Sequence, residues 1–368
     1  MLLSLPVELV ERIVRFALPA EVTSKTYWRR QRVLQAFCLT SSLLCDVAQP
    51  ILEETVWVPT ARSWRGGVVR LAKQPKRFRM LWIGERPWSG WGALAPVLPS
   101  CELLQDLRIT GEAHVDLRCL EHLPNLRCLV LRKVFLASSD FTLRRIIELT
   151  VDGCYLPTGD AIIAPSSFPS LRHLALGEEP KAKPSYSEPS FLGPYYSQVS
   201  SCVTSGRYVP PSEELPCLFL HSASWQAFDG RLADCFTHTA YLKLWESKEA
   251  AQGRARYYDG PFGAGGARHY EQLFCALRRA LHKVDAIALA LLYLPTAFTT
   301  FQVPAVQEAL DAFVADCAAG GIEVDYEDEE LAEGEVAISR KFAVYAEEQR
   351  AKRKKEEEDD DEAGEEPA

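Results

Sequence analysis

An apolar pattern at positions 1, 4 and 6 recurs through the middle of this 368-residue chain. Five copies begin at residues 78, 104, 126, 146 and 171, so that consecutive copies start 26, 22, 20 and 25 residues apart. The copies are Phe78, Leu81, Ile83; Leu104, Leu107, Ile109; Leu126, Leu129, Leu131; Ile146, Leu149, Val151; and Leu171, Leu174, Leu176. Because side chains alternate along a strand, positions 4 and 6 lie on one face. Five triplets at this spacing predict an internal repeat.

The period and the pattern resemble the leucine-rich repeat, whose units span about 20 to 29 residues. The resemblance implies parallel strands stacked into a solenoid with a shared core. Further strands are expected at Leu215, Leu218, Leu220; at Thr239, Leu242, Leu244; and at Val284, Ile287, Leu289. Residues 178–214, rich in proline and serine, and residues 247–267, rich in glycine, are expected to be loop excursions from the array.

Two amphipathic helices are predicted near the end of the array. Residues 269–284 place Leu273, Leu277 and Leu281 on one face. The second helix, 304–319, begins at a proline and is followed by two glycines, which is the usual punctuation of a helix. Ile322, Val324 and Tyr326 then alternate as a strand, so residues 303–326 are predicted to be a last helix–strand unit.

The first sixteen residues predict a short helix that begins at a proline. Pro6 has no N–H to lose in the first helical turn, and its fixed φ suits a helix. Leu9, Ile13 and Phe16 follow at i, i+4 and i+7, so they form one apolar stripe. After a polar stretch, residues 21–31, a second apolar segment runs from residue 33 to residue 52.

These two segments resemble an F-box, the module that docks substrate adaptors onto cullin–RING ubiquitin ligases. In that family the second and third helices end in a run similar to Ala48-Gln49-Pro50-Ile51-Leu52, and a strand follows, here Val56-Trp57-Val58. The resemblance covers about residues 3–55, and the repeats behind it are typical of fungal F-box proteins with degenerate leucine-rich repeats. The polar stretch is longer than the usual F-box spacing, and the consensus residue after a repeat strand is clear only at Cys154.

Together the two resemblances imply an α/β fold in three parts. Residues 1–55 are expected to form a helical F-box-like domain, and residues 56–326 a leucine-rich-repeat solenoid with parallel strands on its concave side and helices and irregular turns outside. The remaining residues, 327–368, are a charged tail with four basic and nine acidic residues from 352 onward, where disorder is expected. The basic quartet Lys352 to Lys355 fits either a nuclear-import signal or a frayed charged helix.

The F-box resemblance implies a substrate-recognition subunit of an SCF-type ubiquitin ligase, which binds a Skp-type adaptor and presents a protein substrate for ubiquitin-dependent degradation. The residues that would bind the adaptor are Leu5, Pro6, Glu8, Leu9, Ile13, Leu39, Leu43 and Pro50. Because aromatic anchors are enriched at interfaces, Trp82, Trp88 and Trp91 are candidate substrate contacts, with capping of the core as the alternative. The competing function is a leucine-rich-repeat scaffold, unrelated to ubiquitin, whose N-terminal helices only cap the solenoid.

Motifs and composition argue against other classes of function. The sequence has no GxSxG, GxxxxGK[ST], HExxH or CxxC motif, so no catalytic residue, cofactor or metal is predicted. Eleven widely spaced cysteines indicate reduced thiols in the cytoplasm or nucleus. No apolar run of about 18 residues and no signal peptide occur, so no membrane contact is expected. The net charge is −9, and no nucleic-acid partner is expected.

Overall fold

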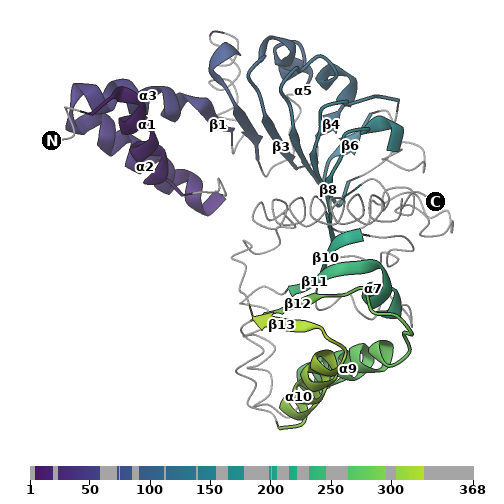
Figure 1. The fold of residues 1–368 in the computed structure, drawn as a ribbon. Helices are drawn as coiled ribbons and strands as arrows, with labels where there is room; N and C mark the ends of the chain where they lie inside the picture. The colour runs from purple at the N-terminus through teal and green to yellow at the C-terminus, as the bar shows by residue number, and fades with distance from the viewer. Residues whose placement is uncertain are drawn as a thin grey trace, which may run out of the picture. The chain divides into compact units, whose positions relative to one another are not determined.

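A computed structural model of the chain shows a mixed α/β protein whose strands pair in parallel (Figure 1). It describes residues 5–19, 24–58, 73, 75–84, 91–111, 113–137, 140–154, 165–177, 199, 201–204, 215–221, 232–245, 264–295 and 304–326. The chain divides into two compact units. The first comprises residues 1–146 and 155–157, and the second comprises residues 147–154 and 158–368.

The first unit opens with three helices, which we call the helical module: α1 (Val7–Phe16), α2 (Ser24–Thr40) and α3 (Ser42–Glu54). Pro6 precedes α1, as predicted. Ser41, the one residue between α2 and α3, caps α3 because its hydroxyl accepts a hydrogen bond from the Leu44 N–H at 3.2 Å. The polar stretch 21–31 was expected to separate two helices, but α2 already begins at Ser24.

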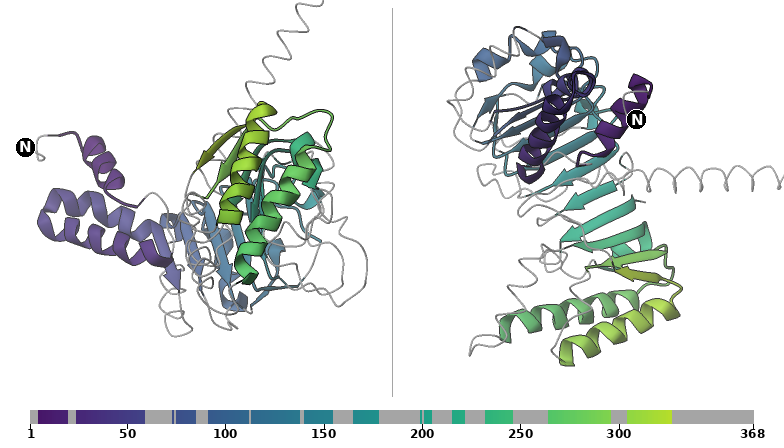
Figure 2. Two further views of the ribbon diagram at one scale, coloured as in Figure 1. Left: turned by 90° about the horizontal axis from the view of Figure 1, so that it is seen from below. Right: turned by 90° about the vertical axis from the view of Figure 1, so that its left-hand side faces the viewer.

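The three helices share a small apolar core, and α2 and α3 lie side by side (Figure 2). Its buried members are Val10, Val14, Leu18, Leu34, Val47, Ala48 and Ile51. Within α1, the side chains that enter this core are Val10 and Val14, one turn apart. The helix therefore packs through a different stripe from the one that the sequence analysis singled out.

A parallel sheet follows the helical module in the first unit. Its strands lie in the order β1 (Thr55–Val58), β2 (Met80–Ile83), β3 (Asp106–Thr110) and β5 (Cys128–Arg132). Two short strands, β4 (His114–Val115) and β6 (Phe135–Leu136), pair separately. Short helical turns connect them: η2 (Pro75–Arg77), α5 (Trp91–Leu94), η3 (Leu98–Ser100) and η4 (Leu117–Leu120).

The repeat triplets align across this sheet. Position 4 of the pattern forms one row, Val56, Leu81, Leu107 and Leu129, and every member of this row is buried. Position 6 forms a second buried row, Val58, Ile83, Ile109 and Leu131. The strands expected at these triplets are therefore present, and they meet in matching register.

The second unit continues with parallel strands and adds longer helices. The strands are β7 (Glu148–Asp152), β8 (His173–Leu176), β9 (Ser201–Thr204), β10 (Leu215–His221), β11 (Thr239–Trp245), β12 (Leu291–Leu294) and β13 (Glu323–Tyr326), which neighbour one another in this order. The helical elements are η5 (Pro165–Ser167), α7 (Leu232–His238), α9 (Ala264–Leu281) and α10 (Pro304–Ala319). The predicted helix 304–319 is confirmed. Helices α9 and α10 pack side by side through stacked Phe274 and Phe313, whose ring centroids are 6.2 Å apart (Figure 2).

Two predictions in the second unit were wrong in detail. Strand β9 lies inside residues 178–214, which were expected to be a loop excursion, and it pairs with β8 and β10. The triplet expected at Val284, Ile287 and Leu289 was misplaced, since β12 begins only at Leu291 and Ile287 is exposed. The residues with the 1, 4, 6 spacing at this strand are Leu289, Leu292 and Leu294, all of them buried.

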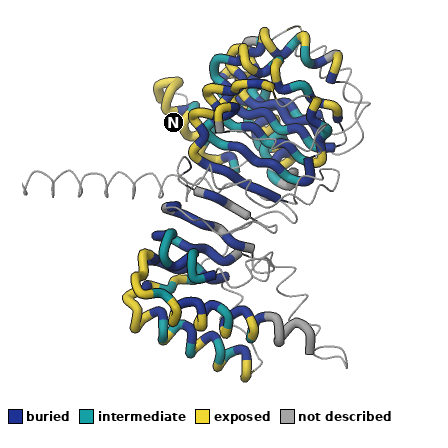
Figure 3. Tube along the Cα trace, turned by 90° about the vertical axis from the view of Figure 1, so that its right-hand side faces the viewer, coloured by how far each residue is buried: buried dark blue, intermediate teal, exposed yellow. Residues whose placement is uncertain are grey.

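Three strands are each followed by a residue with positive φ, which the sequence analysis did not predict. Gly111, Lys133 and Gly153 have φ values of 109°, 53° and 58° and come directly after β3, β5 and β7. Each is the eighth residue counted from the start of its triplet. Within each unit the buried residues follow the strands, whereas exposed residues gather on the outer sides of the helices (Figure 3).

Candidate docking surface

Exposed large apolar side chains are concentrated in the helical module and the residues just before it. Of the nine that occur in the described part of the chain, seven belong to this region, and two, Leu103 and Ile287, lie elsewhere. Five of the seven are on or beside α1: Leu5, Val7, Leu9, Ile13 and Phe16. Leu9, Ile13 and Phe16 follow one another at i, i+4 and i+7, so they lie on one side of the helix, and we call these three the α1 apolar face. Phe16 is 94% exposed, and Leu39 at the end of α2 is 88% exposed.

Helix α1 is apolar around more of its circumference than the module can bury. Val10 and Val14 are each 1% exposed, whereas Leu9 and Ile13 are 43% and 46% exposed. At 3.6 residues per turn, these two pairs form adjacent stripes on one short helix. The α1 apolar face is therefore the stripe that remains after the helix has packed against α2 and α3.

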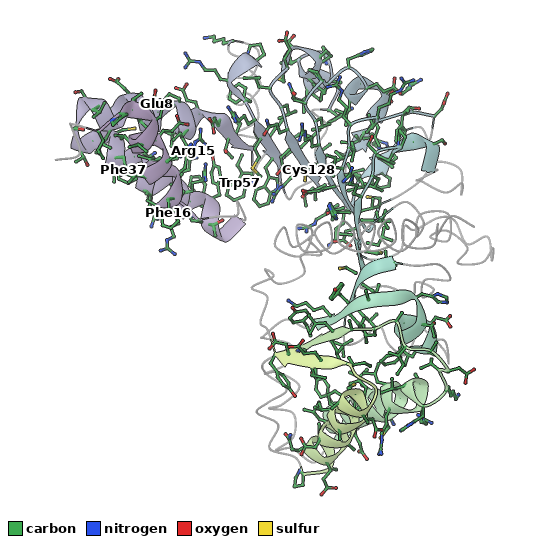
Figure 4. All side chains as sticks on the ribbon, viewed as in Figure 1. Glu8, Arg15, Phe16, Phe37, Trp57 and Cys128 are labelled. Atoms are coloured by element: carbon green, nitrogen blue, oxygen red, sulfur yellow. The ribbon has the colours of Figure 1, made fainter. Side chains whose placement is uncertain are left out.

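An ion-pair network holds α1 in this orientation. The Arg15 guanidinium donates two hydrogen bonds to the Glu54 carboxylate, at 3.0 and 2.8 Å, and a third to Glu11 at 2.8 Å. Glu54 also lies 3.6 Å from the Arg79 guanidinium, just before β2. Hydrogen bonding to Glu54 raises the pKa of Arg15, although partial burial opposes the shift. The last turn of α1 is thus fixed to the end of α3, while the neighbouring Phe16 stays exposed (Figure 4).

The predicted adaptor-binding residues occupy all three helices. Pro6 and Glu8, at the start of α1, are exposed, as are Leu5, Leu9 and Ile13. Leu43 is partly buried and packs against the core, and Pro50 is an exposed residue inside α3. Of the predicted residues of α1, Leu9 and Ile13 share one side of the helix, and Phe16, which is absent from the predicted set, lies on the same side. Phe16 could have been identified from the sequence, because its spacing extends the stripe of Leu9 and Ile13 by one turn.

The tryptophans proposed as substrate contacts are placed differently. Trp82 on β2 is 5% exposed and Trp91 in α5 is 6% exposed, whereas Trp88 lies outside the described residues. Trp82 stacks on Trp57 with centroids 5.1 Å apart, and the Arg108 guanidinium lies 5.7 Å from its ring. Substrate contact by these residues remains a prediction, and the geometry shows Trp82 engaged inside its own unit.

An aromatic cluster therefore joins the helical module to the sheet. Trp57 on β1 contacts Tyr27 and Trp28 of α2 at centroid distances of 5.0 and 5.5 Å. Its other side stacks on Trp82. Together with the pairing of Arg79 and Glu54, this cluster ties α2 and α3 to the first strands of the sheet.

The thiols of the chain have the chemistry of core residues. None of the eleven cysteines, all of which are described, forms a disulfide bond, and six of them are buried. Burial raises the pKa of Cys101 to about 11 and that of Cys202 to about 12, so both stay protonated and weakly nucleophilic near neutral pH. Among the described residues, no three His, Cys, Asp or Glu side chains gather as a metal site would require. None of the described helices combines the length and apolar character needed to cross a membrane.

Comparison with known proteins adds no identification. No protein-family model and no curated protein matches this sequence.

Proposed function

We propose that this protein is the substrate-recognition subunit of an SCF-type cullin–RING ubiquitin ligase. In this proposal α1, α2 and α3 form an F-box that binds the Skp-type adaptor, and the strand array holds a protein substrate. The observation that supports it most directly is that α1 has two apolar stripes, one buried in the module and one exposed. Val10 and Val14 pack the helix into the module, while Leu9, Ile13 and Phe16 remain exposed on an element that an ion-pair network fixes in place.

The energetics of this surface favour a partner. Burying a Leu, Ile or Phe side chain stabilises by about 1.5 to 3 kcal/mol. Exposed apolar side chains gathered on one element, rather than scattered singly, mark an interaction site. A few such anchors supply most of the binding energy of an interface of ordinary size.

We further propose that the strand array is a leucine-rich-repeat solenoid. Its support is the alignment of position 4 of the pattern in each unit, which in the second unit gives the row Leu149, Leu174, Cys202, Leu218, Leu242, Leu292 and Val324. The left-handed residue at position 8 recurs with the same period. Stacked repeats of this kind commonly bind other proteins, which fits the substrate-holding role.

The competing function, a scaffold whose N-terminal helices only cap the solenoid, requires Leu9 and Ile13 to pack against the first repeat. Both residues are instead more than two-fifths exposed, and the contacts between the module and the sheet come from Trp57, Glu54 and Arg79. The α1 apolar face therefore favours docking over capping.

Binding of the full chain to a purified Skp-type adaptor tests the proposal. Because the three side chains are exposed, we expect L9A/I13A/F16A to keep its circular dichroism and melting temperature but to lose adaptor affinity by roughly 100-fold or more. The matched control is L103A/I287A, which removes the two exposed apolar side chains outside the module and is expected to bind as the wild type does. Failure of the wild type to bind, or equal binding by the triple variant, would exclude the proposed role.

A further inference from the structure

A strong charge asymmetry sets the beginning of the chain apart. Residues 1–84 contain thirteen basic and six acidic residues, a net charge of +7, and since the whole chain carries −9, the remainder carries −16. Within this region, α2 has four basic residues, Lys25, Arg29, Arg30 and Arg32, and no acidic one. A positive field of this kind attracts an acidic partner and raises its rate of association.

Five described arginines of the first unit are engaged by carboxylates. Arg15 pairs with Glu11 and Glu54, and the others pair as Arg77 with Glu53, Arg79 with Glu54, Arg108 with Asp106 and Arg118 with Asp116. Arg29 and Arg32 differ from them. Both are exposed, and neither forms an ion pair or a side-chain hydrogen bond with any residue that the structure describes.

An exposed tryptophan stands beside these two arginines. Trp28 is 54% exposed, although part of its ring packs on Tyr27 and Trp57. Trp28 and Arg32 are one helical turn apart, and Arg29 and Arg32 are three residues apart, so the three side chains share one side of α2. We call this set, Trp28, Arg29 and Arg32, the Trp28 face. The aromatic cluster behind Trp28 keeps its ring in place without a partner.

We propose that the Trp28 face binds an acidic segment of a partner protein, with carboxylates on Arg29 and Arg32 and an apolar side chain of the same segment against the Trp28 ring. Arginine presents a fork of donors that matches a carboxylate, and tryptophan and arginine are the side chains most enriched at the centre of interfaces. The face is separate from the α1 apolar face, and the inference does not require α1 to dock a ligase adaptor.

The size of the face favours a short acidic segment over a nucleic acid. Tight binding of nucleic acid depends on many phosphate contacts spread along a groove or a face. On α2 the two exposed arginines are Arg29 and Arg32, while Arg77, Arg79 and Arg108, nearer the sheet, pair with Glu53, Glu54 and Asp106. Two carboxylates and one apolar side chain match this set in number and in kind.

Fluorescence anisotropy on the full chain tests the inference. The probe is a labelled peptide of repeating Glu-Glu-Phe units, compared with the same peptide carrying Gln in place of Glu. We expect the acidic peptide to bind more tightly than its amide counterpart and to weaken as salt is raised. R29E/R32E should reduce its affinity by roughly tenfold or more, and W28A by several-fold.

The matched control is R127E/R144E, a reversal of two exposed arginines of the same unit that also lack an ion pair among the described residues. We expect it to bind the acidic peptide as the wild type does, and we expect L9A/I13A/F16A to do the same, which separates this face from the docking proposal. Equal loss in R127E/R144E would show a diffuse charge effect and overturn the inference. The inference would also be overturned if the Gln peptide bound as tightly as the Glu peptide, or if W28A and R29E/R32E bound the Glu peptide as the wild type does.

Other occupants of the face are distinguished in the same assay. Tighter binding of a single-stranded oligonucleotide or of phosphatidylserine vesicles than of the peptide would assign the face to nucleic acid or lipid and contradict the inference. The chain also contains its own acidic run, Glu356 to Glu362. Peptide binding that appears only after removal of residues 352–368 would make that run the occupant in place of a partner protein.

Discussion

At the level of single residues, the positive-φ position that follows β3, β5 and β7 is occupied by glycine twice and by lysine once. Gly111 and Gly153 adopt positive φ without steric cost, but Lys133 holds φ of 53° with a β-carbon in place. Left-handed conformations cost a non-glycine residue roughly 1 to 2 kcal/mol. Lys133 is the only such residue in the described part of the chain, so it is a local site of strain.

We therefore expect Lys133→Gly to stabilise the protein, in contrast to most substitutions. The gain in the free energy of unfolding should be about 0.5 to 1 kcal/mol, because the greater freedom of glycine in the unfolded chain offsets part of the relieved strain. Urea denaturation of the full chain measures it. The controls are G111A and G153A, which place a β-carbon at the equivalent positions and should destabilise; a stability decrease in K133G would refute the account.

At the scale of elements, the contact between α2 and the sheet depends on stacked aromatic rings. Trp82 is 5% exposed and lies between Trp57 and the guanidinium of Arg108. We expect Trp82→Ala to lower the free energy of unfolding by about 3 kcal/mol, since it removes a large buried ring and leaves a cavity. Denaturant unfolding followed by circular dichroism checks the value.

Trp28→Ala serves as the comparison for that substitution. Its ring touches the same cluster but is 54% exposed, so we expect a loss of less than about 1 kcal/mol. Equal losses from both substitutions would mean that the stack does not depend on burial of Trp82. A W82A loss below that of W28A would contradict the role given to the stack.

Some helices and strands were predictable from the sequence, and others were not. The helix 304–319 and the strands at triplets such as Leu104, Leu107 and Ile109 were predictable because their apolar period and their punctuation agree. Strand β9 was missed because Ser201–Thr204 offers one clear apolar side chain at position 4, Cys202, in a stretch otherwise rich in loop residues. Strand β12 was shifted because several overlapping triplets can be drawn through its leucine-rich sequence.

The sequence could not show which apolar stripe of α1 is buried and which is exposed. Leu9 with Ile13 and Val10 with Val14 have the same spacing, so helical periodicity alone cannot decide which pair enters the core. The choice depends on the positions of Leu34, Val47 and Ile51, which come from the other two helices. Most of the candidate docking residues were identifiable as an apolar stripe, but their exposure was a property of tertiary packing.

Across the molecule as a whole, buried cysteines in both units make the stability of the fold depend on pH. Cys101 belongs to the first unit, whereas Cys202 and Cys317 belong to the second, and all three are buried. Burial raises the pKa of Cys101 to about 11 and that of Cys202 to about 12, and burial together with the Asp316 charge raises that of Cys317 to about 12. In the unfolded chain these thiols ionise near pH 9, about their ordinary value.

The sign of the resulting pH dependence follows from these values. Below about pH 9 each thiol is neutral in both states, so its contribution to stability is complete. As the pH rises from about 9 towards 11 or 12, the unfolded chain releases protons that the folded chain retains, and stability is lost. We expect the urea midpoint to be nearly constant from pH 7 to about 8.5 and to fall progressively above it.

The variant C202A/C317A isolates the thiols from other groups that titrate in alkali. We expect it to be less stable than the wild type at pH 7, because two buried side chains are shortened, yet to show a shallower decline between about pH 9 and 10.5. C275A, which removes the exposed thiol, should follow the wild-type curve. If the double variant declines as steeply as the wild type, burial of these thiols does not determine the alkaline limit of the fold.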